Sequence, residues 1–410
     1  MENVSSSNGL EKRPKLRFPS FDEPYRSTQL GNIASLVNRT DPKSNAPIMM
    51  LSSGNGFIMQ SEKYSRDNAG QSLKKYILLK QGELAYNHGA SKAKQFGCCY
   101  ELTEPEARIP YVYHCFKIND HEYTPFVAMA LNNTKMDKQL KRLVSSSVRM
   151  DGLLNITFED YMSVTLHLPS SNEQKRIADF LQKIDERIVA QEKLLVSLKK
   201  YKRGLISEIL KQKLVITHED ETWEEVSLSD VADGFEYGMN AAATSFDGEH
   251  KYIRITDIDD DAHTYIDSDP VSPSGVLEEK YRVGKDDILF ARTGASVGKS
   301  YHYRKTDGDL FFAGFLIRIH VKEGVDSEYV FLNTLTEEYD KWVLLESARS
   351  GQPGINAEQY RRYRFKLPSL RTQRRIAAIA QKFDNQIQRE TVCLRLLQEH
   401  RHGLLQQLFI

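Results

Sequence analysis

The chain has 410 residues, of which 40% are hydrophobic and 27% charged, an ordinary balance for globular domains and a length that suits two or three of them. No apolar run reaches the 18 residues that a membrane-spanning helix needs, and the first residues, MENVSSSNGLEKRPK, lack the apolar centre of a signal peptide. We therefore expect a cytoplasmic protein with no membrane partner, whose residues 1–24 form a flexible N-terminal leader.

The net charge is zero, but the charges are distributed unevenly along the chain. Residues 1–167 carry 21 basic and 17 acidic side chains, 168–213 carry 11 and 6, 214–366 carry 17 and 30, and 367–410 carry 7 and 3. Nucleic-acid-binding domains are usually basic, whereas the segment 214–366 is strongly acidic. Any DNA-binding surface on this segment must therefore be a local basic face.

A long segment of the sequence occurs twice. LPSSNEQKRIADFLQKIDERI begins at Leu168 and LPSLRTQRRIAAIAQKFDNQI begins at Leu367, an offset of 199 residues. Solenoid repeats have periods of up to about 50 residues, so this repeat indicates a duplicated module, a globular part followed by a long helix. In chain order we expect a leader (1–24), a first globular part (25–167), a central helix (168–213), a second globular part (214–366) and a C-terminal helix (367–410).

Both globular parts alternate short β-rich runs, such as KYIRITDIDDD and FFAGFLIRIHV, with Gly, Asn and Asp turns. Helical stretches are expected around Glu122–Arg142 and Ser327–Ser347. The pattern predicts the α+β class, with two globular α/β domains related by a pseudo-twofold internal repeat. The two copies agree at their edges and diverge in the middle, which favours two modules that recognise different targets.

The two repeated helices carry apolar or long side chains at alternating steps of four and three, the a/d seam of a coiled coil. The central seam positions are Ile184, Ile188, Gln191, Leu195, Leu198 and Lys202 in the first helix, and Phe383, Ile387, Glu390, Leu394, Leu397 and Arg401 in the second. A parallel pair would oppose Lys202 and Arg401. We therefore predict an antiparallel coiled coil that sets Lys202 against Glu390 and Gln191 against Arg401. The alternative is that these polar residues lie on a solvated edge of the seam.

Each of these helices follows a proline and a serine that can cap it. Ser170 and Glu173 have the spacing of a full capping box, whereas Ser369 and Thr372 supply only half of one.

Candidate DNA contacts are residues of the types that bind base edges or phosphates and that lie in or near loops. In the first globular part they are Asn55, Tyr64, Asn87, His88, Ser91, Lys92 and Lys94. In the second they are Arg254, Thr256, Arg292, Thr293, Ser296, Lys299, Arg349 and Gln352. Each of them could instead be an ordinary solvated or turn-forming residue.

Several short motifs suggest catalysis but lack the required spacing. ARTGASVGKS places Thr293 where a phosphate-binding loop needs its first glycine, and a turn that presents Arg292, Thr293 and Ser296 is the better interpretation. Glu278–Glu279–Lys280 resembles half of a nuclease motif without its acidic partner. The 11 histidines and four cysteines show no metal-ligand set, and we expect reduced cysteines. No catalytic residue, metal or cofactor is expected on this chain.

Taken together, PKLRFPSF near the start, the ILFARTGASVGKS and GQPGINAEQ blocks and the two LP…Q..IA…D..I helices resemble the specificity subunit of type I restriction–modification systems. The resemblance spans nearly the whole chain. It implies a non-catalytic subunit in which two target recognition domains each read half of a bipartite double-stranded DNA site, and the helices fix the spacer. It also implies two methyltransferase subunits and two restriction/translocase subunits as partners, which carry S-adenosylmethionine, ATP and Mg. One departure is AYNHGAS in the first part, where the second has ARTGAS.

Two other interpretations compete with this one. The chain could be a coiled-coil protein scaffold without sequence-specific DNA binding, which the acidic segment 214–366 favours. It could also be a self-contained nuclease or ATPase, which rests only on the two imperfect motifs.

Overall fold

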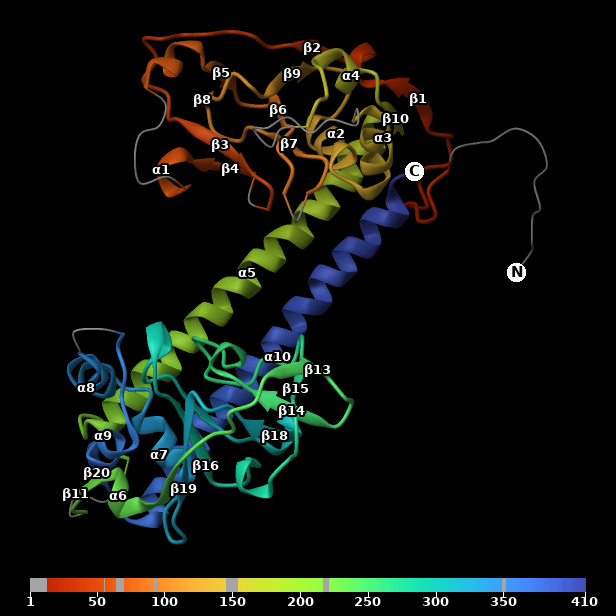
Figure 1. Ribbon diagram of the computed structural model, residues 1–410. Coiled ribbons are helices and arrows are strands. Elements are labelled where there is room, and N and C mark those ends of the chain that lie inside the picture. Colours follow the sequence, from red (N-terminus) through yellow and green to blue (C-terminus); the bar gives the residue numbers. More distant parts are fainter. Residues whose placement is uncertain are drawn as a thin grey trace, which may run out of the picture. The chain divides into compact units, whose positions relative to one another are not determined.

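The computed structural model describes residues 13–54, 56–63, 70–91, 94–144, 154–216, 221–348 and 352–410. The chain divides into two compact units, Met1–Gln191 with Cys393–Ile410, and Glu192–Val392. Each unit holds one globular part and one segment of each of two long helices, α5 (Ser171–Leu210) and α10 (Leu370–Leu408) (Figure 1). The predicted α+β class and the alternation of globular parts with long helices are confirmed.

The first unit is built on a four-stranded antiparallel sheet with the order β2-β9-β6-β7. Two further antiparallel pairs, β3-β4 and β5-β8, extend the globular part, and β1 pairs with β10 beside the start of α5. The strands are β1 (Arg26–Gln29), β2 (Ala34–Leu36), β3 (Met49–Ser52), β4 (Gly56–Met59), β5 (Ile77–Lys80), β6 (Leu84–Asn87), β7 (Cys98–Glu101), β8 (Glu106–Ile109), β9 (His114–Ile118) and β10 (Thr165–Leu168). The helices are α1 (Gln60–Lys63), α2 (Thr124–Leu131), α3 (Thr134–Leu143) and α4 (Phe158–Met162).

The second unit repeats this plan. Its four-stranded antiparallel sheet has the order β12-β19-β16-β17, and β11 pairs with β20 as β1 pairs with β10. The parallel pair β14-β18 and the antiparallel pair β13-β15 are added to it. The strands are β11 (Glu224–Ser227), β12 (Ala232–Tyr237), β13 (Ala243–Ser245), β14 (His250–Ile253), β15 (Val271–Pro273), β16 (Asp287–Ala291), β17 (Ser300–His302), β18 (Asp309–Phe312), β19 (Leu316–Val321) and β20 (Arg364–Leu367). The helices are α6 (Leu228–Val231), α7 (Ser327–Asn333), α8 (Glu337–Ser347) and α9 (Ala357–Arg361).

The duplication extends to the helix caps. Thr157 and Asp160 form a capping box at the start of α4, and Asn356 and Gln359 form one at the start of α9. These residues are related by the same offset of 199. Each box satisfies backbone N–H groups that a short helix leaves unbonded, so both copies begin the same element by the same local chemistry.

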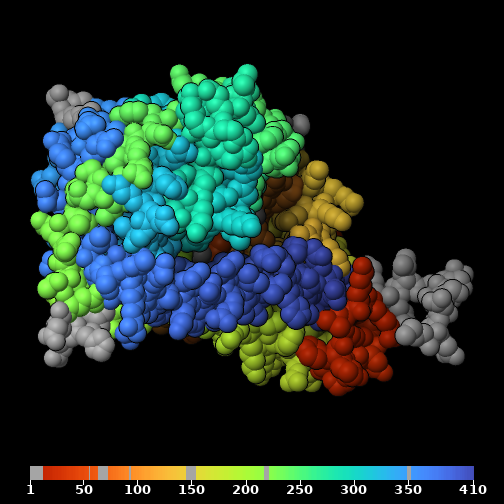
Figure 2. Space-filling view, turned by 90° about the horizontal axis from the view of Figure 1, so that it is seen from below, coloured from red at the N-terminus to blue at the C-terminus, as the bar shows by residue number. Residues whose placement is uncertain are grey.

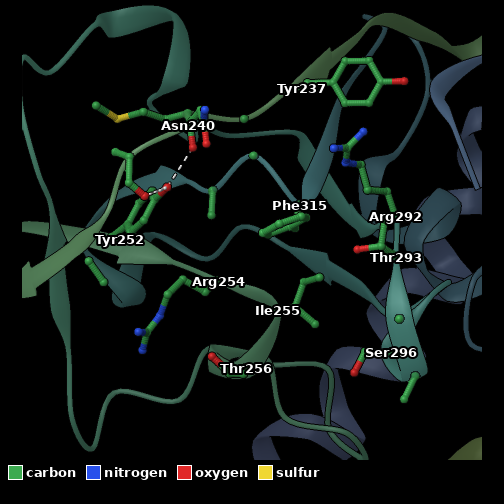
Figure 3. Close-up of a pocket in the computed structure, with 18 of the residues that line it drawn as sticks. Tyr237, Asn240, Tyr252, Arg254, Ile255, Thr256, Arg292, Thr293, Ser296 and Phe315 are labelled. Carbon is green, nitrogen blue, oxygen red and sulfur yellow. Dashed lines mark hydrogen bonds between the residues drawn. The ribbon is translucent and has the colours of Figure 1, made fainter. Parts of the chain in front are cut away.

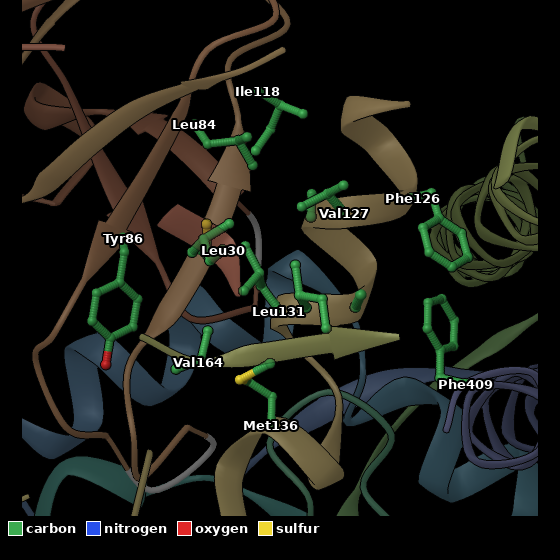
Figure 4. Packing of buried hydrophobic residues seen from close by; sticks show 14 of the residues in the cluster. Leu30, Leu84, Tyr86, Ile118, Phe126, Val127, Leu131, Met136, Val164 and Phe409 are labelled. Atoms are coloured by element: carbon green, nitrogen blue, oxygen red, sulfur yellow. The ribbon is translucent and has the colours of Figure 1, made fainter. Parts of the chain in front are cut away.

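The main core of the first unit lies between the sheet and helices α2 and α3, and it includes one end of α10. Figure 4 shows Leu30, Leu84 and Ile118 facing Val127 and Leu131 of α2. Phe409, just after α10, stacks on Phe126 with ring centroids 5.0 Å apart. A stacked aromatic pair contributes about 0.5–1.5 kcal/mol beyond its buried area, so this contact helps to anchor the C-terminal segment in the core.

The sequence predicted a flexible leader over residues 1–24, but in the structure residues just before Tyr25 contact helix α5. The guanidinium of Arg17 donates two hydrogen bonds to Glu173 of α5, at 2.8 and 2.7 Å, and the ring of Phe18 contacts that of Phe180. The Glu173 side chain is fully buried, and both of its oxygens are bonded to Arg17. Arg17 and Phe18 are therefore packed on α5, because the Glu173 carboxylate, which the sequence assigned to a capping box, is buried and binds the Arg17 guanidinium.

At α10 the half capping box is completed from another part of the chain. Glu221 accepts hydrogen bonds from the Ser369 amide at 2.9 Å and from the Thr372 hydroxyl at 2.7 Å. A carboxylate at this position also matches the positive end of the helix dipole.

The long helices pair in an antiparallel direction in both units. In the first unit, Ile177 and Leu181 near the start of α5 share a core with Leu404 and Leu408 near the end of α10. In the second unit, Ile206 and Ile209 at the end of α5 share a core with Ile376 and Ala380 at the start of α10. The predicted antiparallel direction is therefore confirmed.

The ion pairs of the seam correct the predicted register. Lys202 bonds Asp384 rather than Glu390, at 2.6 Å, and Arg401 bonds Asp185 rather than Gln191, with Nη2 2.9 Å from Oδ2. Asp384 and Asp185 lie immediately after seam positions, so these long cationic side chains reach carboxylates at the edge of the seam. There they stay partly solvated, which lowers the cost of desolvating the charges.

The predicted seam positions face inward along both helices. Ile188, Gln191 and Leu195 are buried, and the remaining central positions are half-buried: Ile184, Leu198, Lys202, Phe383, Ile387, Glu390, Leu394, Leu397 and Arg401. The outward side of α10 is open to solvent, as Figure 2 shows for one face.

Candidate nucleic-acid interface

A cleft of about 1000 Å³ opens in the second unit where four strands end. Its walls come from the end of β12 and the residues up to the start of β13, from β14 and the residues after it, and from the residues that follow β16 and β18, together with Gln352 (Figure 3). Of the residues predicted to contact DNA, those that line it are Arg254, Thr256, Arg292, Thr293, Ser296 and Gln352. The structure thus gathers these residues, which are up to 98 positions apart in the sequence, into one site.

Glycines allow the loops around the cleft to approach one another. A Cβ atom on Gly238 would lie only 2.2 Å from the carbonyl oxygen of Ala313. The neighbouring amide of Met239 donates to the Phe312 carbonyl at 2.8 Å, and Gly314 donates to the Met239 carbonyl at the same distance. Only glycine permits such a close backbone approach, so this wall of the cleft depends on residue 238.

The turn that follows β16 carries Arg292, Thr293 and Ser296. Gly294 has a φ of +78°, a conformation that L side chains rarely adopt, and its amide donates to the Pro353 carbonyl at 3.1 Å. The backbone bridge between Thr293 and Gly354 holds the turn against the segment before α9. The sequence ARTGAS therefore forms a turn whose backbone is fixed by these contacts, and the turn carries the predicted residues Arg292, Thr293 and Ser296 at the cleft.

Arg292 lies between two exposed aromatic rings. Its guanidinium carbon is 4.9 Å from the ring centroid of Tyr237 and 5.9 Å from that of Phe315, and Figure 3 shows the three side chains together. The Nε atom is buried and has no hydrogen-bond partner among the described residues. The two aromatic rings therefore hold the Arg292 guanidinium in place, and its N–H groups remain available to donate hydrogen bonds to a ligand.

Arg254 is held in a different way. Asp257 accepts two hydrogen bonds from its guanidinium, both at 2.8 Å, and this bonding raises the pKa of Arg254. The pair fixes the orientation of the arginine and offsets much of its charge.

The charge of the cleft differs from that of its domain. Among the described residues that line it are two arginines, Arg254 and Arg292, and no carboxylate, although residues 214–366 carry 30 acidic and 17 basic side chains. The cleft is therefore locally basic within this acidic segment, and Arg292 supplies most of its charge because Asp257 offsets much of that of Arg254.

Lys299 does not line the cleft. Its ammonium donates to the Ile258 carbonyl at 3.0 Å and pairs with Asp260, and its side chain is only 11% exposed. We therefore withdraw Lys299 from the predicted DNA contacts, because its charge is used to fix the loop after β14. Arg349 lies outside the described residues.

The predicted contacts of the first unit have mainly local structural roles. His88 is 6% exposed and packs against Tyr86 and His114, so we withdraw it as a DNA contact. Asn87 accepts from the Gly89 amide and Ser91 from the Lys94 amide, both within turns. Lys94 donates to the Asn132 carbonyl at 2.7 Å. The other three, Asn55, Tyr64 and Lys92, lie outside the described residues.

The sequence did not single out three residues that help to shape the cleft, Tyr237, Asn240 and Phe315. The two aromatic residues are 44% and 60% exposed, and each lies next to a glycine, Gly238 or Gly314. An aromatic residue beside a glycine at the end of a β-rich run is the signal that could have identified them.

The fold defines a class of protein with two duplicated α+β modules and a pair of long helices. The chain matches the family model for the type I restriction modification DNA specificity domain twice, over residues 43–200 and 220–394. The chain therefore belongs to this family. Its role is DNA specificity within a restriction–modification system, and it is not the catalytic component. This membership decides against the scaffold and the nuclease or ATPase interpretations.

Solved structures share the fold. The type I restriction–modification S subunit from M. genitalium is 15% identical with a TM-score of 0.57, and the alignment covers 97% of this chain and 99% of that one. A chain from a study of complex assembly and conformational transition of the type I R-M system is 16% identical with a TM-score of 0.56, covering 94% and 97%. Among curated proteins, no sequence matches the chain.

No metal-binding group of three or more His, Cys, Asp or Glu side chains occurs in the described part of the chain. None of the helices in that part has the length and apolar character to cross a membrane.

Proposed function

We propose that each globular part reads one half of a bipartite double-stranded DNA site, and that the cleft after β12, β14, β16 and β18 is the reading surface of the second. The proposal rests on the two arginines that line the cleft of an otherwise acidic domain, with no carboxylate among the described residues of its lining. Arg254 and Arg292 can bind bases or phosphates, and Thr256, Thr293, Ser296 and Gln352 supply neutral hydrogen-bonding groups.

The paired helices fit the role of a spacer ruler. Each is about 40 residues long, which at 1.5 Å per residue gives a rod of about 60 Å.

Apolar side chains also remain exposed on the two helices, including Val196 and Tyr201 on α5 and Leu396 on α10. We propose that the helices carry two methyltransferase subunits and two restriction/translocase subunits, which bind S-adenosylmethionine, ATP and Mg. We also propose that the complex is cytoplasmic.

A matched insertion into both helices tests the ruler. Adding seven residues between Val196 and Ser197 and seven between Arg395 and Leu396 keeps the heptad phase and lengthens each helix by about 10 Å. The methylated site should gain about three base pairs of spacer, at about 3.4 Å each, while both half-sites stay unchanged. Altered half-sites with the original spacer would contradict the ruler.

The cleft is tested by removing its cations in the full complex. Arg254→Ala and Arg292→Ala should weaken recognition of the second half-site and leave the first half-site as it is. Arg362→Ala is the control, because Arg362 is an exposed arginine of the same unit outside the cleft. An equal effect on both half-sites would exclude the cleft as the reading surface of the second.

A further inference from the structure

Arg292 occupies a rigid position at the end of a central strand. It directly follows β16, which has neighbours on both sides in the sheet. Its amide donates to the Phe315 carbonyl at 3.1 Å, and its own carbonyl accepts from the Ile355 amide at 2.9 Å. The main chain at Arg292 is therefore fixed from two sides before any ligand binds, which lowers the entropy that binding must overcome.

The aromatic rings also restrict the orientation of the guanidinium. Tyr237 is itself held, because its hydroxyl accepts a hydrogen bond from the Ala357 amide at 3.2 Å. A guanidinium stacks on such ring faces through cation–π contacts while its terminal nitrogen atoms remain free to donate in its plane. The arrangement therefore fixes the direction of a planar donor fork.

Several arginines of this unit have carboxylate partners, whereas Arg292 has aromatic ones. Arg254 bonds Asp257, Arg282 bonds Glu279, and Arg318 pairs with Glu236. Within the described residues, Arg292 forms no ion pair, and its buried Nε has no hydrogen-bond partner. A partly desolvated cation without an acceptor is costly, so this site is suited to a ligand that brings acceptors.

The geometry selects the kind of acceptor. Guanine presents two neighbouring acceptors in the major groove, O6 and N7, which match the two terminal nitrogens of one guanidinium, whereas adenine presents a donor beside N7. A phosphate can be approached from many directions and does not require a fixed fork. A fork fixed by two rings is better suited to distinguishing one base from another.

We propose that Arg292 reads a guanine in the half-site of the second unit, with Nη1 and Nη2 donating to O6 and N7 of that base. The inference rests on the proposed function of the cleft and adds the identity of one base. Arg254, whose fork is already occupied by Asp257, has the supporting role of positioning the DNA backbone.

The test replaces single atoms of the DNA and therefore does not depend on the folding of any variant. The full complex with its methyltransferase subunits is offered duplexes in which each guanine of the second half-site is replaced in turn by 7-deazaguanine, which lacks the N7 acceptor. One replacement should weaken binding, and by less than the roughly 5- to 150-fold that a whole bidentate arginine–guanine contact contributes, because the O6 acceptor remains. Inosine at the same position, which keeps O6 and N7, should bind nearly as well as guanine.

Variants then assign the effect to Arg292. Arg292→Ala should be insensitive to that 7-deazaguanine and should accept all four bases at that position only, whereas Arg362→Ala should behave as the wild type. Arg292→Lys keeps the charge and provides a second variant if Arg292→Ala does not assemble; it should lose most of the guanine preference.

The remaining outcomes separate the inference from the proposed function. If Arg292→Ala weakens binding equally for all sequences, or if no guanine of the second half-site is sensitive, Arg292 contacts phosphate and the inference is overturned while the proposed function stands. If the wild-type complex shows no preference for any second half-site, the proposed function fails and the inference fails with it.

Discussion

Lys202 and Asp384 form an ion pair, with Nζ 2.6 Å from Oδ1, in the second unit. Arg401 and Asp185 form one in the first unit. The offset of 199 residues relates Lys202 to Arg401 and Asp185 to Asp384, so the two ion pairs are the same contact made twice. The duplication has thus preserved a charge contact at the edge of the seam together with the apolar repeat, and the basic residue is Lys in one copy and Arg in the other.

This ion pair should contribute measurably to stability. The side chains of Lys202 and Asp384 are 16% and 28% exposed, so the pair is screened less than a surface pair. We expect a coupling free energy of about 1 kcal/mol, the upper end of the range for exposed pairs, from a double-mutant cycle with Lys202→Ala and Asp384→Ala in urea unfolding.

The control for this cycle is Arg203 with Asp340, a pair of the same unit whose side chains are 64% and 61% exposed. Its coupling free energy should be close to zero. Equal coupling for the two pairs would show that the seam ion pair is an ordinary surface contact.

A second prediction concerns Arg17. Its removal leaves the fully buried carboxylate of Glu173 without its main partner. Breaking a buried pair from one side costs about 3–5 kcal/mol, so Arg17→Ala should strongly destabilise the first unit. Hydrogen exchange in β10 and at the start of α5 should detect the change.

Two further variants check the cause of this loss. Lys15→Ala removes a neighbouring exposed cation and should be nearly neutral. Adding Glu173→Gln to Arg17→Ala should recover part of the lost stability, because the buried group is then uncharged. The absence of any recovery would mean that packing, rather than the unpaired charge, explains the effect.

A third prediction concerns Gly238 in the cleft wall. A Cβ at this position would lie 2.2 Å from the Ala313 carbonyl oxygen, so Gly238→Ala must displace the two loops. We expect a loss of about 1–3 kcal/mol, as for other overpacked sites, and weaker recognition of the second half-site.

The matched control is Gly204→Ala. This glycine lies in α5 of the same unit, and nothing would lie within 4 Å of its added Cβ. Alanine in a helix interior is favoured over glycine by about 1 kcal/mol, so this variant should be slightly more stable than the wild type. Equal melting temperatures for the two alanine variants would exclude the steric argument.

A fourth prediction concerns acid stability. Burial tends to raise the pKa of Glu83, but the hydrogen bonds from Arg39 and from the Lys80 amide outweigh it, so the pKa is lowered. A lowered pKa stabilises the folded state at pH values above the ordinary glutamate value of 4.5, and this stabilisation is lost as the pH falls through the folded pKa.

Glu83→Gln keeps the acceptor for the Lys80 amide but cannot titrate. The protection of β6 against hydrogen exchange should therefore fall less between pH 5 and 3 in this variant than in the wild type, an interval set at about one unit around the ordinary glutamate pKa. Identical acid profiles for the two proteins would contradict the assignment of this pH dependence to Glu83.

The sequence predicts those parts of the structure that depend on local patterns. The heptad positions of α5 and α10 face inward, and the turn residues of ARTGAS place Arg292, Thr293 and Ser296 at the cleft. These outcomes follow from periodicity and from the conformational needs of Gly294.

Tertiary contacts decide the features that the sequence did not predict. Lys202 reaches Asp384 because a long side chain can bond a residue beside the seam, and heptad spacing does not encode that reach. His88 is buried because His114 of β9 packs against it, although its loop position alone suggested exposure. The guanidinium of Arg292 lies near the rings of Tyr237, at the end of β12, and Phe315, just before β19, and these contacts depend on the fold.

Methylation mapping in cells that express this chain with its methyltransferase subunit tests whether the two globular parts read a bipartite DNA site. We predict one new bipartite motif, with N6-methyladenine in each half and a gap of fixed length. A soluble, assembled complex that methylates no such motif would contradict this prediction.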